Sequence, residues 1–307
     1  MPRQINNAPP PEGQIIHEQA HPACEGFMAA GGTEADRNTL LLLRNYCVIV
    51  NFIAMKAKTI LITGATSGIG EACARRFAGQ GTRLILNGRN TAKLDELRRE
   101  LEAAGSEVRT LPFDVRDREA MSSAVASLPE DWSEVDVLIN NAGLSLGDDK
   151  EYEGSLEEWD TVIDTNVRAL LAMTRLVVPG MVERGRGHIV NIGSIAGDTP
   201  YGGGGVYCAS KAAVKALSDS LRIDLVDTPL RVTNVKPGKV ETHFSVTRYH
   251  GDQARADAVY EGFEPLHGED VAEVVYFAVS APDHVQIAEV LVMPTAQATS
   301  TLCARKK

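Results

Sequence analysis

The sequence lacks the excess of basic residues that binding to nucleic acids or to anionic membranes requires. Its 31 Lys and Arg residues are outnumbered by 41 Asp and Glu residues, which gives a formal net charge of -10 at pH 7. A negative protein repels partners that are themselves negative. The charge balance argues against a nucleic-acid partner or a membrane-surface protein, and a small-molecule partner fits better.

Cysteine pairs and long apolar runs are also missing. The five cysteines are widely spaced and never form a C-x-x-C pair, so the sequence indicates neither a disulfide framework nor a zinc site, and we expect no metal: Cys24, Cys47, Cys73, Cys208 and Cys303. No secretory signal is recognisable, and no uncharged apolar run reaches the roughly 18 residues of a membrane span. These absences predict a protein of the reducing cytoplasm.

The first 54 residues do not resemble the rest of the chain. Residues 1–38 show neither helical nor strand periodicity, and the apolar stretch Leu40–Met55 is interrupted by Arg44, Asn45 and Asn51. Because Met55 directly precedes the first expected strand, we interpret residues 1–54 as an extension that is disordered or absent from the native protein. A weak membrane anchor is the alternative. Residues 55–307 are the expected folded domain.

From Thr59 onward, short β-rich runs alternate with segments of helical periodicity, which is typical of parallel strands joined by helices. The expected strands are Thr59–Ile62, Arg83–Asn87, Glu107–Leu111, Val135–Ile139, His188–Ile192, Arg231–Val235 and Glu289–Val292. The expected helices are Ile69–Gln80, Ala92–Ala104, Arg118–Ala126, Leu156–Arg184, Tyr207–Val226 and Glu269–Ser280. The pattern predicts one α/β domain: a doubly wound Rossmann fold, with a seven-stranded parallel sheet and helices on both faces.

A glycine-rich turn follows the first expected strand directly, with the sequence Thr63-Gly64-Ala65-Thr66-Ser67-Gly68-Ile69-Gly70. Glycines allow a backbone to approach a pyrophosphate, and the helix that follows supplies free N–H groups. Alone, such a turn can be an ordinary strand-to-helix connection, but with its strand and helix it predicts dinucleotide binding.

The residues after the second strand predict which dinucleotide is bound. A carboxylate at this point binds the ribose 2′-hydroxyl of NAD, whereas this sequence has Asn87-Gly88-Arg89. The guanidinium of Arg89 suits a 2′-phosphate, so the sequence favours NADP. A solvated, helix-capping Arg89 is the alternative.

Ser194, Tyr207 and Lys211 are the expected catalytic residues. Ser194 follows the fifth strand, and Tyr207 and Lys211 are four residues apart at the start of an expected helix, so their side chains share one face. We expect the lysine to lower the pKa of the phenol, which then exchanges a proton with an alcohol or carbonyl oxygen held by Ser194. Each residue alone could be structural, and their order after a nucleotide turn argues against chance.

With these motifs in place, residues from Met55 to about Gln297 resemble the classical short-chain dehydrogenase/reductase family. The resemblance implies that Asn166 is a fourth catalytic residue, which supports a water relay to the lysine. It implies a cofactor-binding set of Gly64, Thr66, Ser67, Gly68, Ile69, Gly70, Arg89, Asp114, Val115, Asn141, Ala142, Gly143, Tyr207, Lys211, Pro237, Gly238, Val240 and Thr242. It also implies a homotetramer formed through the helices of Leu156–Arg184 and Tyr207–Val226.

Within this family, the sequence resembles more specifically the NADP-dependent 3-hydroxy acid dehydrogenases. Four segments carry this resemblance: Asn140–Gly147, Pro179–Arg184, Pro200–Gly204 and Val292–Pro294. This subgroup implies hydride transfer at C3 of serine, allo-threonine, 3-hydroxyisobutyrate or malonic semialdehyde. Such substrates carry a carboxylate, and Arg248, after Thr242, is the candidate that binds it with Ser194 close by. Lys239 stands where many relatives carry an aliphatic residue, and the sequence offers no reason for it.

Two other functions stay open at this point. One is a ketoreductase acting on acyl thioesters or other ketones, as many members of the family do. The other is a regulator that senses NADP without chemistry, although such proteins usually lose the tyrosine or the lysine.

Overall fold

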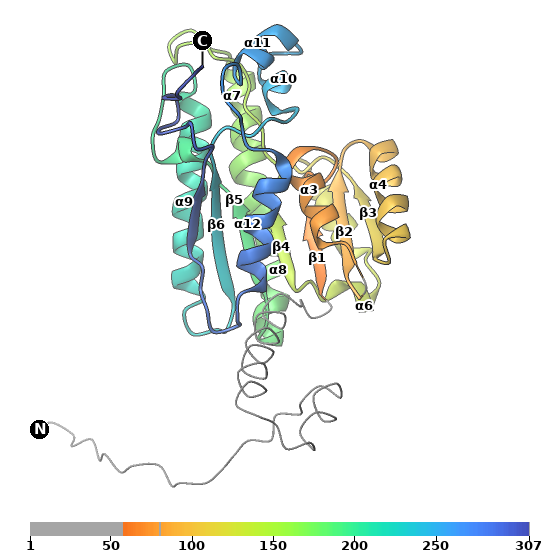
Figure 1. The fold of residues 1–307 in the computed structure, drawn as a ribbon. Coiled ribbons are helices and arrows are strands. Elements are labelled where there is room, and N and C mark those ends of the chain that lie inside the picture. The colour runs from red at the N-terminus through yellow and green to blue at the C-terminus, as the bar shows by residue number, and fades with distance from the viewer. Residues whose placement is uncertain (1–57, 80, 307) are drawn as a thin grey trace, which may run out of the picture. The chain divides into compact units, whose positions relative to one another are not determined.

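The computed structural model describes residues 58–79 and 81–306, and the expected N-terminal extension and the cysteines Cys24 and Cys47 lie outside them. Seven strands form one parallel sheet in the order β3-β2-β1-β4-β5-β6-β7. They are β1 Thr59–Ile62, β2 Arg83–Gly88, β3 Glu107–Pro112, β4 Val137–Asn140, β5 His188–Ile192, β6 Arg231–Pro237 and β7 Glu289–Val292. This is the predicted Rossmann fold (Figure 1).

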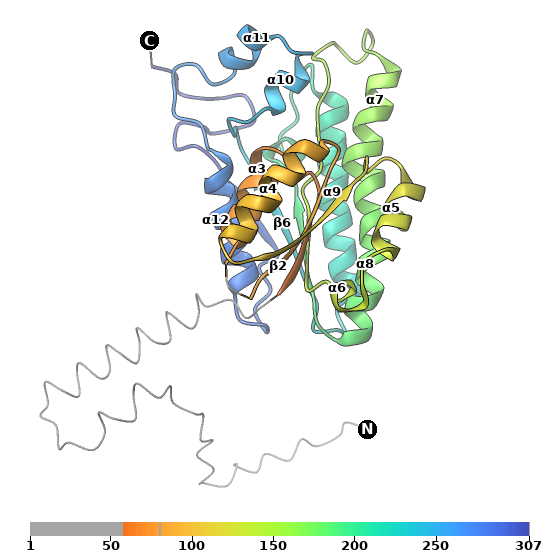
Figure 2. The same ribbon diagram turned by 90° about the vertical axis from the view of Figure 1, so that its right-hand side faces the viewer.

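Helices cover both faces of the sheet, because successive strand residues point to opposite sides. Ile60 and Ile62 pack on one side with α3 (Gly68–Phe77), α4 (Thr91–Ala103) and α12 (Gly268–Ser280). Leu61 packs on the other side with α5 (Arg118–Ala126), α6 (Glu130–Ser133), α8 (Ala169–Arg184) and the end of α9 (Gly205–Asp224). Figure 2 shows these two layers. The central strands β1 and β4 are buried on both faces, which explains why their sequences are almost continuously apolar.

The expected long helix Leu156–Arg184 is helical from end to end, but it contains a π-helical turn that the sequence analysis did not predict. α7 (Leu156–Ile163) passes into a π-helical turn, η1 (Asp164–Arg168), before α8 begins. The N–H of Ala169 donates to the carbonyl of Asp164, five residues earlier, which widens the helix at Asn166. The fourth strand is also shorter than expected, since it begins at Val137 rather than Val135.

Two short helices that the sequence analysis did not predict lie after β6. They are α10 (Phe244–Arg248) and α11 (Gln253–Ala258), and we call the segment from Thr242 to Ala258 the lid. Figure 1 shows both helices at the same end of the domain as the C-terminal segment. A short 3-10 turn, η2 (Ile195–Gly197), follows β5 at this end.

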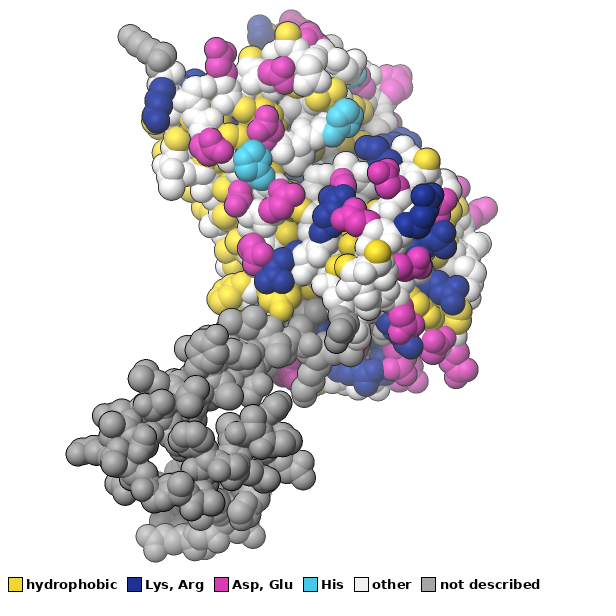
Figure 3. Space-filling view, turned by 45° about the vertical axis from the view of Figure 1, so that its right-hand side comes forward, with side chains coloured by type: hydrophobic (Ala, Val, Ile, Leu, Met, Phe, Trp, Pro, Cys, Tyr) yellow, Lys and Arg dark blue, Asp and Glu magenta, His cyan; other side chains and the backbone are white. Residues whose placement is uncertain are grey.

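The described residues contain no helix long and apolar enough to cross a membrane. Cys73, Cys208 and Cys303 are free thiols. On the face drawn in Figure 3, acidic and basic side chains are interspersed without a broad patch of either sign.

Candidate active site

The glycine turn after β1 is fixed by hydrogen bonds to the segment after β4. The Thr63 hydroxyl accepts hydrogen bonds from the backbone N–H groups of Asn141 and Ala142, both at 3.0 Å, and the Asn141 side chain donates to the Thr63 and Gly64 carbonyls. Gly64 has a φ of +66°, and a Cβ there would lie 3.0 Å from the Ala142 Cα. Glycine is therefore required for the two segments to approach this closely.

The N-terminus of α3 opens into a cavity of about 780 Å³ at the carboxyl edge of the sheet. Ser67, Gly68 and Ile69 line this cavity, and the Ser67 side chain makes no capping hydrogen bond to the helix. The first N–H groups of the helix therefore keep their capacity to bind an anion. Gly70 does not line the cavity, but a Cβ there would lie 2.4 Å from the Gly64 carbonyl oxygen, so it keeps the turn compact.

Two arginines stand at the end of the cavity that follows β2 and β3. Arg116 binds the Asp114 carboxylate at 2.7 Å, and Arg89 Nη1 lies 3.9 Å from the same carboxylate with its side chain 67% exposed. The bond to Arg116 holds the pKa of Asp114 below its usual value. Asn87 is buried, and its amide donates to the Leu111 and Phe113 carbonyls. No free carboxylate among the described residues therefore stands where the ribose of NAD would be bound.

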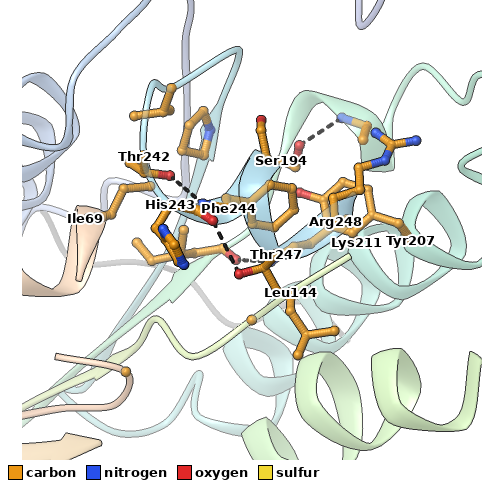
Figure 4. A pocket seen from close by; sticks show the side chains of 18 of the residues that line it. Ile69, Leu144, Ser194, Tyr207, Lys211, Thr242, His243, Phe244, Thr247 and Arg248 are labelled. Atoms are coloured by element: carbon orange, nitrogen blue, oxygen red, sulfur yellow. Dashed lines mark hydrogen bonds between the residues drawn. The ribbon is translucent and has the colours of Figure 1, made fainter. Parts of the chain in front are cut away.

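Ser194, Tyr207 and Lys211, which the sequence predicts to be catalytic, line one wall of the same cavity (Figure 4). The Ser194 Oγ accepts a hydrogen bond from the Ala196 N–H at 3.1 Å, which fixes it at the start of η2. Lys211 is 5% exposed, and its ammonium donates to the Ile192 carbonyl at 2.8 Å, so strand β5 holds the lysine on α9 in place. The Tyr207 ring packs against the lid residue Phe244, with 5.5 Å between ring centroids.

The pKa of Tyr207 differs from the sequence-based expectation. Burial raises it above its usual value, while the hydrogen bond with Ser194 and the charge of Arg248 lower it by less. The Lys211 ammonium lies 5.9 Å from the ring centroid and is itself desolvated, which lowers the lysine pKa to about 8. Burial is the largest cause of the raised tyrosine pKa, and Lys211 is not among its causes, so the expected lowering by the lysine stays a prediction.

Asn166 does not line the cavity but lies in the π-helical turn beside it. Its side chain accepts from the Leu144 N–H and donates to the Leu144 carbonyl, both at 2.8 Å, and it also donates to the Ser210 hydroxyl. A Cβ on Gly143 would lie 3.2 Å from Asn166 Oδ1 and 3.4 Å from Lys211 Nζ. The glycine therefore lets the asparagine approach the lysine closely.

The segment after β6 carries the remaining predicted residues. Pro237, Gly238, Val240 and Thr242 line the cavity, and the Thr242 side chain lies against Gly68, where a Cβ would be 3.0 Å from its methyl group. This contact joins the lid to the glycine turn.

Arg248 also lines the cavity, and its guanidinium is bonded to protein acceptors on three sides. It donates to the Gly147 carbonyl, the Tyr201 hydroxyl and the Gly203 carbonyl at 3.0–3.1 Å. Arg248 therefore ties α10 to the loops after β4 and β5. Its predicted bond to a substrate carboxylate stays a prediction.

All predicted site residues except Gly70 and Asn166 line the cavity, including Asp114, Val115, Asn141 and Ala142. Sequence reasoning missed other lining residues, among them Arg116, Tyr201, His243 and Phe244. The sequence did contain a signal for Arg116, because this residue directly follows the predicted Asp114-Val115 pair. It contained none for Tyr201 and Phe244. No group of three or more His, Cys, Asp or Glu side chains in the described ranges could hold a metal ion.

Known proteins that are similar to this chain are described as dehydrogenases or reductases. The family model described as short chain dehydrogenase matches residues 58–253. An NADP-dependent 3-hydroxy acid dehydrogenase of Escherichia coli (strain K12) is 46% identical over 244 residues, which are 79% of this chain and 97% of the relative. Sulfoacetaldehyde reductase 2 of Chromohalobacter salexigens is 48% identical over 242 residues, or 78% and 96% of the two chains.

A solved structure of a serine dehydrogenase in its closed form, complexed with NADP+, superimposes with a TM-score of 0.76 at 45% identity. The match covers 81% of this chain and all of that one. The fold therefore agrees with that of this solved structure. The chain belongs to the short-chain dehydrogenase family and is an oxidoreductase.

Proposed function

We propose that this enzyme transfers hydride between NADP and C3 of small 3-hydroxy acids. The observation that carries the proposal is that Ser194, Tyr207 and Lys211 line the same cavity as the open N-terminus of α3. The candidate substrates are serine, allo-threonine, 3-hydroxyisobutyrate and malonic semialdehyde.

The residues present fit NADP at both ends of the cofactor. The N–H groups at the start of α3, with the turn from Gly64 to Gly70, suit the pyrophosphate. Arg89 and Arg116 suit a 2′-phosphate, and Asp114 holds Arg116 in place at 2.7 Å. The segment from Pro237 to Thr242 and the residues Asn141–Gly143 would border the nicotinamide. NADP supplies or accepts the hydride.

The protein side of the reaction follows from the geometry of three side chains. The Ser194 hydroxyl accepts the Ala196 N–H and is hydrogen-bonded to Tyr207, so a substrate oxygen that enters between the two hydroxyls can be bound by both. Tyr207, whose pKa is raised by burial, donates its proton to a carbonyl oxygen in reduction and receives it back from the alcohol in oxidation. Lys211, with a pKa of about 8, stabilises the phenolate form, and Asn166 fixes the Leu144 segment beside it.

The substrate class is supported by what the relatives' names share. 3-Hydroxy acids, serine and sulfoacetaldehyde are short molecules with an acid group near the reacting carbon. Arg248 lines the same cavity, but Nε, Nη1 and Nη2 of its guanidinium each already donate to a protein acceptor, so its role toward an acid group stays a prediction.

The test measures NADP+ reduction, followed by the absorbance of the NADPH that forms. Each 3-hydroxy acid is assayed, and so is an acyl-thioester substrate. We expect turnover with the acids and much less with the thioester. Turnover with the thioester alone would favour a ketoreductase. Silence with all substrates, while NADP still binds, would favour a regulator.

We also propose that the enzyme is a cytoplasmic homotetramer. Apolar side chains are exposed on α8 and at the end of α9, at Leu171, Val182, Ile223 and Val226. Contact between copies would remove these side chains from water. Light scattering should give four times the mass of one chain, and a monomeric mass would contradict the proposal.

A further inference from the structure

Lys239 places a positive charge at the wall of the cavity. The residue lines the cavity directly after Pro237-Gly238 and is only partly exposed. Its ammonium makes no hydrogen bond or ion pair with any of the residues that the structure describes. Burial is the largest cause that lowers the pKa of Lys239; Cys303 raises it by less, and the charges of Arg305 and Arg248 lower it further.

The backbone of Lys239 is fixed on both sides, which leaves only its side chain free to respond to a ligand. Its N–H donates to the Gln297 side-chain oxygen at 2.8 Å, and its carbonyl accepts from the Leu266 N–H at 3.0 Å. Gln297 is 6% exposed and is held by its own bond to the Thr299 carbonyl. The C-terminal segment thus holds the backbone of Lys239 at the wall of the cavity.

The two carboxylates that line the cavity are already paired with arginines. Asp114 binds Arg116, and Asp148 binds Arg255 at 2.5 Å. The basic residues in the wall outnumber these acids, in a chain whose net charge is -10: Arg89, Arg116, Lys150, Lys211, Lys239 and Arg248. The cavity therefore concentrates positive charge, which attracts anions.

The other cations near the catalytic wall are engaged by protein acceptors. Lys211 donates to the Ile192 carbonyl, and Arg248 donates to three acceptors that hold the lid. Arg89 and Arg116 lie with Asp114 at the far end, after β2 and β3. A partly buried, unpaired ammonium is costly, and proteins keep such a group mainly where a ligand completes it.

From this arrangement we infer that Lys239 binds the acid group of the substrate and selects anionic over neutral alcohols. The acid group is a carboxylate in the 3-hydroxy acids, or a sulfonate in a substrate such as sulfoacetaldehyde. An ammonium is a compact point charge that pairs with either group. This inference rests on the proposed function.

The test compares 3-hydroxyisobutyrate with its methyl ester, which has the same carbon skeleton without the charge. Lys239→Met should raise KM for the acid by about 10- to 100-fold, as expected for a lost charge-assisted bond, and change kcat little. For the ester, KM should stay within about twofold. Lys239→Arg should restore most of the affinity for the acid. The same comparison with 2-hydroxyethanesulfonate tests whether the binding of a sulfonate also depends on Lys239.

Lys150→Met is the matched control, because Lys150 also lines the cavity but is exposed. It removes the same charge and should change KM for the acid by less than about twofold. An equal loss in both variants would mean that only long-range attraction is involved, and the inference would be wrong.

Binding gives a readout that does not depend on turnover. NADPH and 3-hydroxyisobutyrate are both reduced, so they form a complex without reaction, and calorimetry gives its Kd. Lys239→Met should weaken this Kd by a factor of about 10 or more. An unchanged Kd, or equal losses for acid and ester, overturns the role of Lys239. Failure of catalysis in the wild type, with charge-dependent binding intact, refutes the proposed function instead.

Discussion

Replacing Lys211 by methionine should stabilise the fold at neutral pH while abolishing activity. Burial lowers the pKa of this lysine from its usual 10.5 to about 8. At about 1.4 kcal/mol per pH unit, the charged lysine costs the native state about 3 kcal/mol at pH 7. Methionine removes this cost but leaves the Ile192 carbonyl without its donor, which costs about 2 kcal/mol. The net gain is about 1 kcal/mol in the free energy of unfolding.

The sign of this effect should change with pH. Below pH 8 the lysine is protonated in both states, so the native state bears the full cost. Between pH 8 and 10.5 the unfolded state binds more protons, so wild-type stability rises with pH. Above pH 10.5 the cost is gone, and the variant, which still lacks the bond to Ile192, should be the less stable protein.

Circular dichroism melting without NADP measures both parts of the prediction. At pH 7 the variant should melt about 2–4 °C above the wild type, and at pH 10.5 or higher it should melt below it. A variant that is less stable at pH 7, or whose difference from the wild type does not change with pH, would refute the reasoning. Loss of at least 100-fold in kcat, as for general acid–base groups, is expected in the same variant.

Three further predictions concern the cavity. Tyr207→Phe should lower kcat by about 10²–10⁴-fold with the Kd for NADP unchanged, and a Kd that rises in parallel would point to a structural role. Arg89→Ala and Arg116→Ala should each weaken the binding of NADP about 10-fold or more and leave the binding of NAD unchanged. Arg89→Asp should shift the cofactor preference to NAD, and fluorescence titration with both cofactors measures these affinities. Gly70→Ala should abolish NADP binding, because its Cβ would lie 2.4 Å from the Gly64 carbonyl oxygen, whereas Gly202→Ala, with open space around it, should bind normally.

The strands could be predicted because the apolar pattern that identifies a strand lies within its own sequence. A parallel strand buried on both faces is expected to be largely apolar, as Thr59–Ile62 and Val137–Asn140 are. The glycine turn was predictable for the same reason, since a left-handed conformation at Gly64 requires a residue without a side chain.

The features that sequence reasoning missed depend on contacts between distant segments. The π-helical turn at Asn166 coincides with hydrogen bonds to Leu144, which is 22 residues away along the chain. The pKa of Tyr207 depends on burial beneath the lid, where Phe244 packs against the ring. Neither of these contacts is encoded in a local pattern. Arg116 is different, because it lies two residues from Asp114 and its bond to that carboxylate is local.

The most direct test of the proposed activity is NADP+ reduction over a panel of short hydroxy acids. The panel includes both serine enantiomers, the threonine stereoisomers and 3-hydroxyisobutyrate, with neutral alcohols of the same length beside them. We predict NADPH formation with at least one of the acids, little with the neutral alcohols, and none in Tyr207→Phe. Binding of NADP without any turnover across the panel would contradict the central claim.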